Sequence, residues 1–190
     1  MQQGNPPAVA YAALTQSSKL QHLDISKCCL PVGVWQYLFH TDRQLPHLTS
    51  LSISEVTQPS EDYAAAPEGS QLVSCCPGLQ SLYVRWLRDT ADRLPALQGL
   101  RGLHTLHLTA SSVVITDDGV VSDTVQTVCQ LTGLRELDMV VQCAVKEGLL
   151  QLTQLQQLTC LDFCQPVEGV DQCISLTCEV SGHFESQACL

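Results

Sequence analysis

The sequence predicts an α/β solenoid. In this fold, a right-handed, horseshoe-shaped stack carries parallel strands on its concave face and helices or irregular turns on its convex face. Three observations predict it. A short apolar pattern recurs six times along the 190 residues, and each interval is long enough for a crossover between parallel strands. Apolar residues at helical spacing also occupy most of those intervals.

The recurring pattern is L-x-x-L-x-L, with apolar substitutions at its fixed positions. Its first residues are 28, 31, 24, 31 and 24 residues apart. A chance alternation would not return six times at such intervals with the same internal phase. The copies are Leu20, Leu23 and Ile25; Leu48, Leu51 and Ile53; Leu79, Leu82 and Val84; Leu103, Leu106 and Leu108; Leu134, Leu137 and Met139; and Leu158, Leu161 and Phe163.

Each copy predicts a short strand with one buried face. The second and third fixed residues are two apart and share a face, while the residues beside them point the other way. Parallel pairing of successive strands therefore predicts three columns of exposed side chains on the concave face. The first column is His22, Ser50, Ser81, Thr105, Glu136 and Cys160; the second is Asp24, Ser52, Tyr83, His107, Asp138 and Asp162; the third is Ser26, Ser54, Arg85, Thr109, Val140 and Cys164.

Apolar residues in the intervals recur at spacings of three and four. Such stripes predict helices that cover the back of the strands. They are Val34, Trp35, Leu38 and Phe39; Leu94, Leu97 and Leu100; Val121, Val125 and Val128; and Leu149, Leu152 and Leu155.

Two segments carry a resemblance to a known family. The runs LQHLDISKC at 20–28 and CPGLQSLYV at 76–84 resemble the leucine-rich repeat family. The run ITDDGV at 115–120 looks like the I-T-D-x-G-L element of its cysteine-containing subclass. The resemblance covers about residues 12–165. The family's Asn/Cys position reads Cys28, Val56, Leu87, Ser111, Gln142 and Pro166, so we expect irregular turns after the later strands.

The domain organisation follows from the extent of the repeats. We expect a disordered lead at 1–11, a domain of about six repeats at 12–165, and an irregular C-terminal tail or poor cap at 166–190. The run 173–180 alternates like a strand and could form such a cap.

Composition excludes several classes of function. The formal net charge of −10 argues against nucleic acid and anionic membrane surfaces, and favours a neutral or basic partner. No apolar run approaches the roughly 18 residues of a membrane helix, and no secretory signal opens the chain. We therefore expect a cytoplasmic protein, with association to the cytoskeleton left open.

The eleven cysteines are odd in number, and we expect reduced thiols packed as small apolar residues. A zinc site is the alternative, and its ligands would come from Cys160, Cys164, Cys173, Cys178 and His183. The sequence contains no glycine-rich phosphate loop, no H-E-x-x-H and no G-x-S-x-G. We expect a protein without catalytic residues, metal or cofactor.

The resemblance implies a protein-binding module or scaffold. Members of the family act as scaffolds, as F-box-associated ubiquitin-ligase substrate receptors, in innate recognition and in cilium axonemes. Tyr83, Arg85, His107 and Asp138 are the candidate partner-binding residues, since Tyr and Arg are frequent interface anchors. The alternatives are an ordinary solvated sheet face, a substrate-recognition part that lacks its F-box, a truncated repeat fragment, and an enzyme with a metal or thiol site. Partner identity and oligomeric state stay open.

Overall fold

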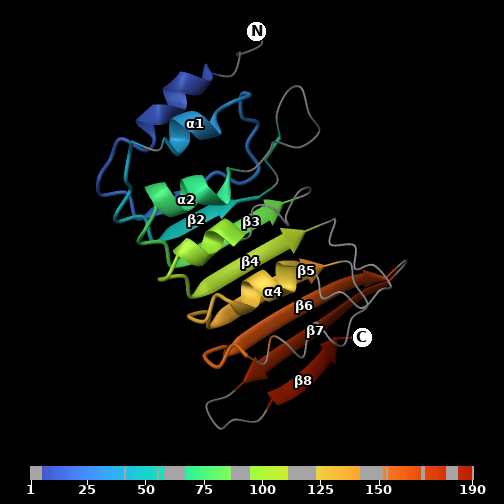
Figure 1. The fold of residues 1–190 in the computed structure, drawn as a ribbon. Helices are drawn as coiled ribbons and strands as arrows, with labels where there is room; N and C mark the ends of the chain where they lie inside the picture. The colour runs from blue at the N-terminus through green and yellow to red at the C-terminus, as the bar shows by residue number, and fades with distance from the viewer. Residues whose placement is uncertain are drawn as a thin grey trace.

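A computed structural model shows the arrangement of the chain (Figure 1). It describes residues 6–40, 42–54, 56–57, 67–86, 95–110, 123–141, 152, 154–167, 170–178 and 184–189. Only the backbone is described at 85–86, 109–110, 123–125, 140–141 and from 163 onward.

The described strands form one open sheet in chain order. β1 to β6 pair in parallel, whereas β7 and β8 add in antiparallel fashion beyond β6. A six-strand parallel sheet with helices and turns between its strands confirms the α/β class. The strands are β1 (His22–Asp24), β2 (Ser50–Ile53), β3 (Ser81–Trp86), β4 (Thr105–Ala110), β5 (Glu136–Val141), β6 (Cys160–Val167), β7 (Val170–Cys178) and β8 (Phe184–Cys189).

Short helices lie along one side of the strands (Figure 1). Two of the predicted apolar stripes contain or overlap an α-helix, and the stripe at 94–100 contains a 3-10 helix. The stripe at 149–155 is described only in part. The helices are η1 (Ala8–Ala13), α1 (Trp35–Leu38), α2 (Gly69–Cys75), η2 (Pro95–Gly99) and α4 (Asp123–Cys129). At the start of α2, the Glu68 N–H donates to Gln71 Oε1 at 3.2 Å, which satisfies one backbone donor of the first turn.

Strand register follows the phase of the sequence pattern. Leu51 pairs with Leu82, and Leu82 pairs with Leu106, so the second fixed positions of successive copies lie side by side. The same alignment continues through Leu137 to Leu161. The predicted phase of the repeat is therefore confirmed from β1 to β6.

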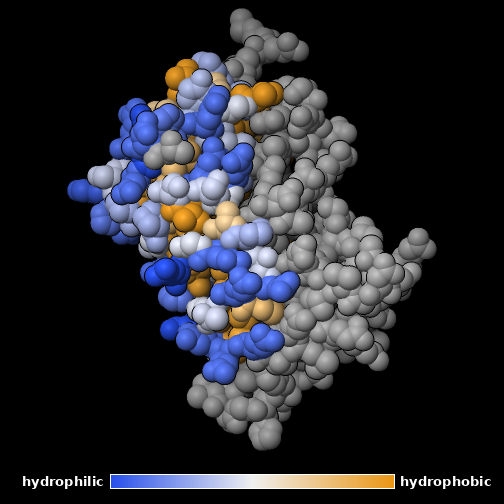
Figure 2. Space-filling model, viewed as in Figure 1, coloured by the Kyte–Doolittle hydropathy of each residue, from blue (hydrophilic) through white to orange (hydrophobic). Residues whose placement is uncertain are grey.

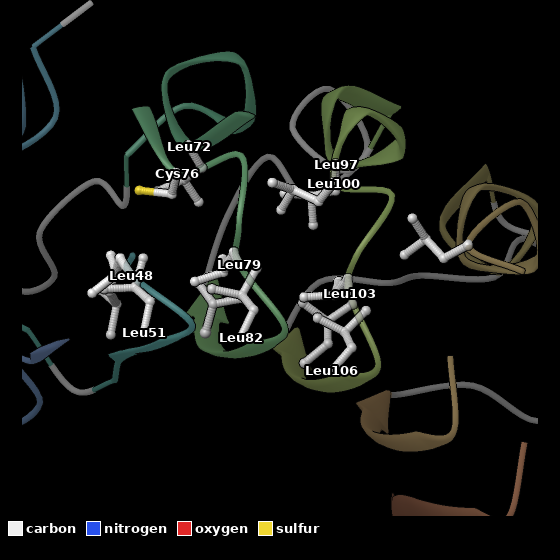
Figure 3. Packing of buried hydrophobic residues seen from close by; sticks show 14 of the residues in the cluster. Leu48, Leu51, Leu72, Cys76, Leu79, Leu82, Leu97, Leu100, Leu103 and Leu106 are labelled. Atoms are coloured by element: carbon white, nitrogen blue, oxygen red, sulfur yellow. The ribbon is translucent and has the colours of Figure 1, made fainter. Parts of the chain in front are cut away.

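The core lies between strands and helices. Leucines of the recurring pattern point from the strands toward leucines of α2 and η2 (Figure 3). Leu72, Leu97 and Leu106 are all fully buried there. Burial of each such side chain contributes roughly 1.5–3 kcal/mol, which makes these layers the main source of stability.

A second repetitive contact links the turns that precede the strands. The carbonyl of Gln21 accepts the N–H groups of Thr49 and Ser50, and later turns repeat this arrangement. It satisfies backbone groups that would otherwise be unpaired at the strand ends. The accepting carbonyls belong to Gln21, Thr49, Gln80, His104 and Arg135.

The turn after β1 contains Cys28, which stands where the leucine-rich repeat pattern has Asn or Cys. Lys27 adopts a positive φ of 58°, and Cys28 Sγ donates to the Ser26 carbonyl at 3.4 Å. Val56, at the same position of the next copy, is buried. Leu87, Ser111, Gln142 and the run at 115–120 lie outside the described residues.

The described residues near both ends of the chain are more regular than the sequence suggests. Residues 8–13, partly within the expected disordered lead, form η1. In the region 166–190, where an irregular tail or poor cap was expected, β6 runs on to Val167 and β7 and β8 follow. β7 contains most of the run 173–180, whose alternation indicated a strand. Pro166 fits within β6 because the pairing with β5 reaches only to Cys164, so the missing proline N–H interrupts no described bond to β5.

Among the described residues, no helix has both the length and the apolar character required to cross a membrane. The described surface in Figure 2 is mainly hydrophilic, with smaller hydrophobic areas between the elements.

Two glycines that precede the first leucine of a copy provide a matched test of packing. A Cβ at Gly78 would lie 2.6 Å from the Pro46 carbonyl oxygen, whereas at Gly102 the nearest atom is the Leu79 oxygen at 3.5 Å. We predict that Gly78→Ala lowers the free energy of unfolding by about 1–3 kcal/mol. Gly102→Ala should leave it unchanged or raise it by up to about 1 kcal/mol.

Urea denaturation followed by far-UV circular dichroism measures both variants. Equal changes in the free energy of unfolding would show that the contact between Gly78 and Pro46 does not limit packing there.

Candidate functional site

The polar face is the side of the sheet that carries the first two predicted columns. Along β4, exposed or half-buried residues alternate with buried Leu106 and Leu108, as the two-residue period of a strand requires. Register pairs Tyr83 with His107 and His107 with Asp138, so the second column is continuous across β3, β4 and β5. The two columns are therefore confirmed as neighbouring rows.

Three of the four candidate residues form a connected chain of contacts. The ring centroids of Tyr83 and His107 are 5.4 Å apart, with the planes tilted by 41°. His107 Nδ1 and Asp138 Oδ2 are 3.1 Å apart, which is hydrogen-bond distance and an ion pair when the imidazole is protonated. Tyr83 is 38% exposed, and the imidazole and carboxylate are comparably accessible, so the contacts leave all three available to a partner.

Arg85 is placed by its backbone alone. It lies in β3 opposite Thr109 of β4, in the third column. Its side chain lies outside the described residues, so its relation to Tyr83 stays a prediction.

Three carboxylates gather at the β5–β6 end of the polar face. Asp138 is the register partner of Asp162, and Glu136 precedes Asp138 by two residues on the same side of β5. Thr105 Oγ1 donates to Glu136 Oε2 at 3.2 Å. The sequence predicted these acids as neighbours, but not the hydroxyl contact, which depends on the side-chain conformations of both residues. We call Glu136, Asp138 and Asp162 the acidic block.

Cys160 lies beside the acidic block, whose negative charges affect the pKa of the Cys160 thiol. Burial raises the pKa of the Cys160 thiol, and the negative charges of Asp162, Glu136 and Asp138 raise it further. The Cys160 Sγ lies 4.0 Å from Asp162 Oδ2. The thiolate, which is the nucleophilic form, is therefore disfavoured at this position.

The vicinal pair Cys75–Cys76 is buried in the core. Burial raises the pKa of both thiols, and for Cys76, where Cys75 adds to the effect, it reaches about 12. Cys75 Sγ donates to the His40 carbonyl at 3.1 Å. These thiols are packed in the core as small apolar groups, as predicted from the sequence.

Most of the side chains that would bind zinc in the alternative prediction lie outside the described part of the structure. Cys164 and Cys173 are register partners across β6 and β7, but their side chains and His183 are not described. Within the described residues, no group of three or more His, Cys, Asp or Glu side chains could hold a metal ion.

The opposite end of the second column is engaged in local bonds. Asp24 Oδ1 accepts the Ser26 N–H at 2.9 Å, and the Ser26 and Ser52 hydroxyls are 2.8 Å apart. The Ser26 backbone N–H lowers the pKa of the Asp24 carboxyl, and the Ser26 and Ser52 hydroxyls lower it further. This carboxylate stabilises a turn.

A scan against models of known protein families finds no match for this chain, and a search of curated proteins finds no similar sequence.

The field at Cys160 gives a direct chemical test. Carboxylates disfavour the thiolate, so the double replacement Asp138→Asn and Asp162→Asn should lower the pKa of Cys160 and speed its alkylation at a given pH. The rate at Cys160 is measured by mass spectrometry of iodoacetamide-treated protein across a pH series. The matched control is Asp42→Asn, which should leave the profile in place.

An unchanged Cys160 profile in the double variant would mean that burial alone sets the pKa of this thiol.

Proposed function

We propose that the chain is a leucine-rich repeat solenoid that acts as a non-enzymatic protein-binding scaffold through its polar face. The curved, right-handed horseshoe and the family membership are part of this proposal. Their support is the six-fold sequence pattern together with a parallel register that keeps its phase from β1 to β6.

One observation carries the binding function. Tyr83, His107 and Asp138 come from three separate copies of the pattern, yet they meet in one row of contacts on an accessible face. An aromatic ring held by its neighbours loses less conformational entropy when it docks than a mobile side chain does. Aromatic residues that are held in this way are typical anchors of protein interfaces.

The chemistry of the face favours binding over catalysis. Nucleophilic catalysis by Cys160 would need a base beside the thiol and a pKa that favours the thiolate. Burial instead raises that pKa, and the neighbouring carboxylates raise it further. We infer a scaffold that needs no cofactor, and we propose that it acts in the cytoplasm.

The proposed function predicts that changes on the polar face remove a specific partner. The variant combines Tyr83→Ala, Arg85→Glu and Asp138→Lys. Loss of interface anchors costs about 2 kcal/mol or more, which corresponds to roughly thirtyfold weaker binding. Quantitative pull-down from lysate, with isotope-labelled mass spectrometry, measures the ratio of each captured protein between variant and wild type.

The control changes the same residue types away from the polar face, in and after α1: Tyr37→Ala, Arg43→Glu and Asp42→Lys. Both variants are first checked for native circular dichroism. Proteins captured by wild type and control but lost from the polar-face variant support the proposal. A capture profile that is identical for all three proteins contradicts it.

A further inference from the structure

We propose that the acidic block and the Tyr83 ring together bind an arginine-containing, extended basic segment of a protein partner. This inference rests on the proposed function and adds the chemistry of the partner.

The carboxylates are spaced for a cationic side chain. Asp138 and Asp162 lie opposite each other on adjacent strands, about 4.8 Å apart in the sheet direction, and Glu136 is two residues along β5. A guanidinium group presents five N–H donors in a planar fork, so it can bridge carboxylates on two strands. The block therefore fits an arginine better than a neutral side chain.

The charge of the block is not balanced within the described part of the chain. Asp138 contacts His107, and no lysine or arginine there forms an ion pair with any of the three carboxylates. Like charges directly opposite on adjacent strands are destabilising. A cation from outside would relieve this repulsion, which gives the polar face a preferred charge in its partner.

The aromatic ring extends the site beyond the carboxylates. Tyr83 lies two strands from Asp138, with the His107 ring between them, and is one of the exposed large side chains of the described residues. A guanidinium stacked on a tyrosine ring gains cation–π energy, which adds to its attraction to nearby carboxylates. Two strand steps span roughly 10 Å, which matches about three residues of extended chain.

The contrast with Asp24 separates this block from ordinary acidic surface. Asp24 occupies the same column at the β1 end, where the Ser26 N–H satisfies one of its oxygens at 2.9 Å. Asp162 has only the weak thiol contact from Cys160 at 4.0 Å among its described contacts. One end of the column thus holds a turn, whereas at the other end the half-buried Asp162 accepts no backbone N–H among its described contacts.

A protein segment suits this surface better than a metal ion or nucleic acid. The described acids do not converge into a group that could hold a metal ion. The net charge of −10 opposes a phosphate backbone. Arginine side chains on an extended peptide can reach the acidic block and the Tyr83 ring at the same time.

The test uses the full chain and defined fluorescent peptides. The probe carries two arginines separated by two small residues, and the comparison peptides replace both arginines with lysine or with glutamate. Fluorescence anisotropy gives Kd at low and high salt. We expect the arginine peptide to bind, the lysine peptide to bind more weakly, the glutamate peptide not to bind, and high salt to weaken binding.

Matched variants locate the site. Asp162→Lys and Asp42→Lys change the net charge equally, but only Asp162 belongs to the block; Asp42 has an 86% exposed side chain beside His40. We expect Asp162→Lys to weaken arginine-peptide binding about tenfold or more, because it juxtaposes like charges. Asp42→Lys should change it by less than about threefold, and Tyr83→Ala should weaken it where Tyr83→Phe does not.

Three results would overturn the proposal: no binding of the arginine peptide to wild type, equal effects of Asp162→Lys and Asp42→Lys, or indifference to Tyr83→Ala. If Asp162→Lys fails to fold, Glu136→Gln with Asp138→Asn takes its place. Failure of the peptide test does not affect the proposed function, because the pull-down tests that function separately. If the pull-down captures a partner through the polar face but the arginine peptide does not bind, the scaffold function stands and the basic ligand is rejected.

Discussion

The leucine layer between strands and helices is the constraint on which the rest of the structure depends. Leu51, Leu82 and Leu106 are register partners and all are buried. Because side chains alternate along a strand, a slip of one residue would move every leucine of that strand to the solvent side. Each misplaced leucine would lose roughly 1.5–3 kcal/mol, so burial strongly favours this register along the six parallel strands.

The same register aligns the residues of the polar face, whatever the length of the loops between the strands. Intervals of 24 and 31 residues both return the chain to the same phase, so extra loop residues leave the columns in place. Tyr83, His107 and Asp138 therefore meet because the leucines beside them are buried. The polar face is a consequence of core packing on the other side of the sheet.

The sequence predicted the features that depend on the two-residue period, namely the buried leucines and the column that places Tyr83, His107 and Asp138 side by side. Features that depend on local detail escaped it. Leu97 and Leu100 are three apart, which suits a 3-10 turn as well as an α-helix, and the chain forms η2. The strand β8 lacks a clear alternation, so its pairing with β7 could not be foreseen. The bond between Thr105 and Glu136 required side-chain conformations that spacing does not determine.

The two ends of the second column show how one register serves different roles. At Asp24, a backbone N–H and two hydroxyls stabilise the carboxylate and lower its pKa, so its charge contributes to the turn after β1. At Asp162, the neighbouring Asp138 and Glu136 add like charge. Burial raises the pKa of the adjacent Cys160 thiol most, and the three carboxylates raise it further. Water can screen such repulsion on an open face, but it supplies no directed positive charge. A cation supplied by a partner would relieve this repulsion, and this is the physical reason for the basic partner that we propose at the acidic end of the polar face.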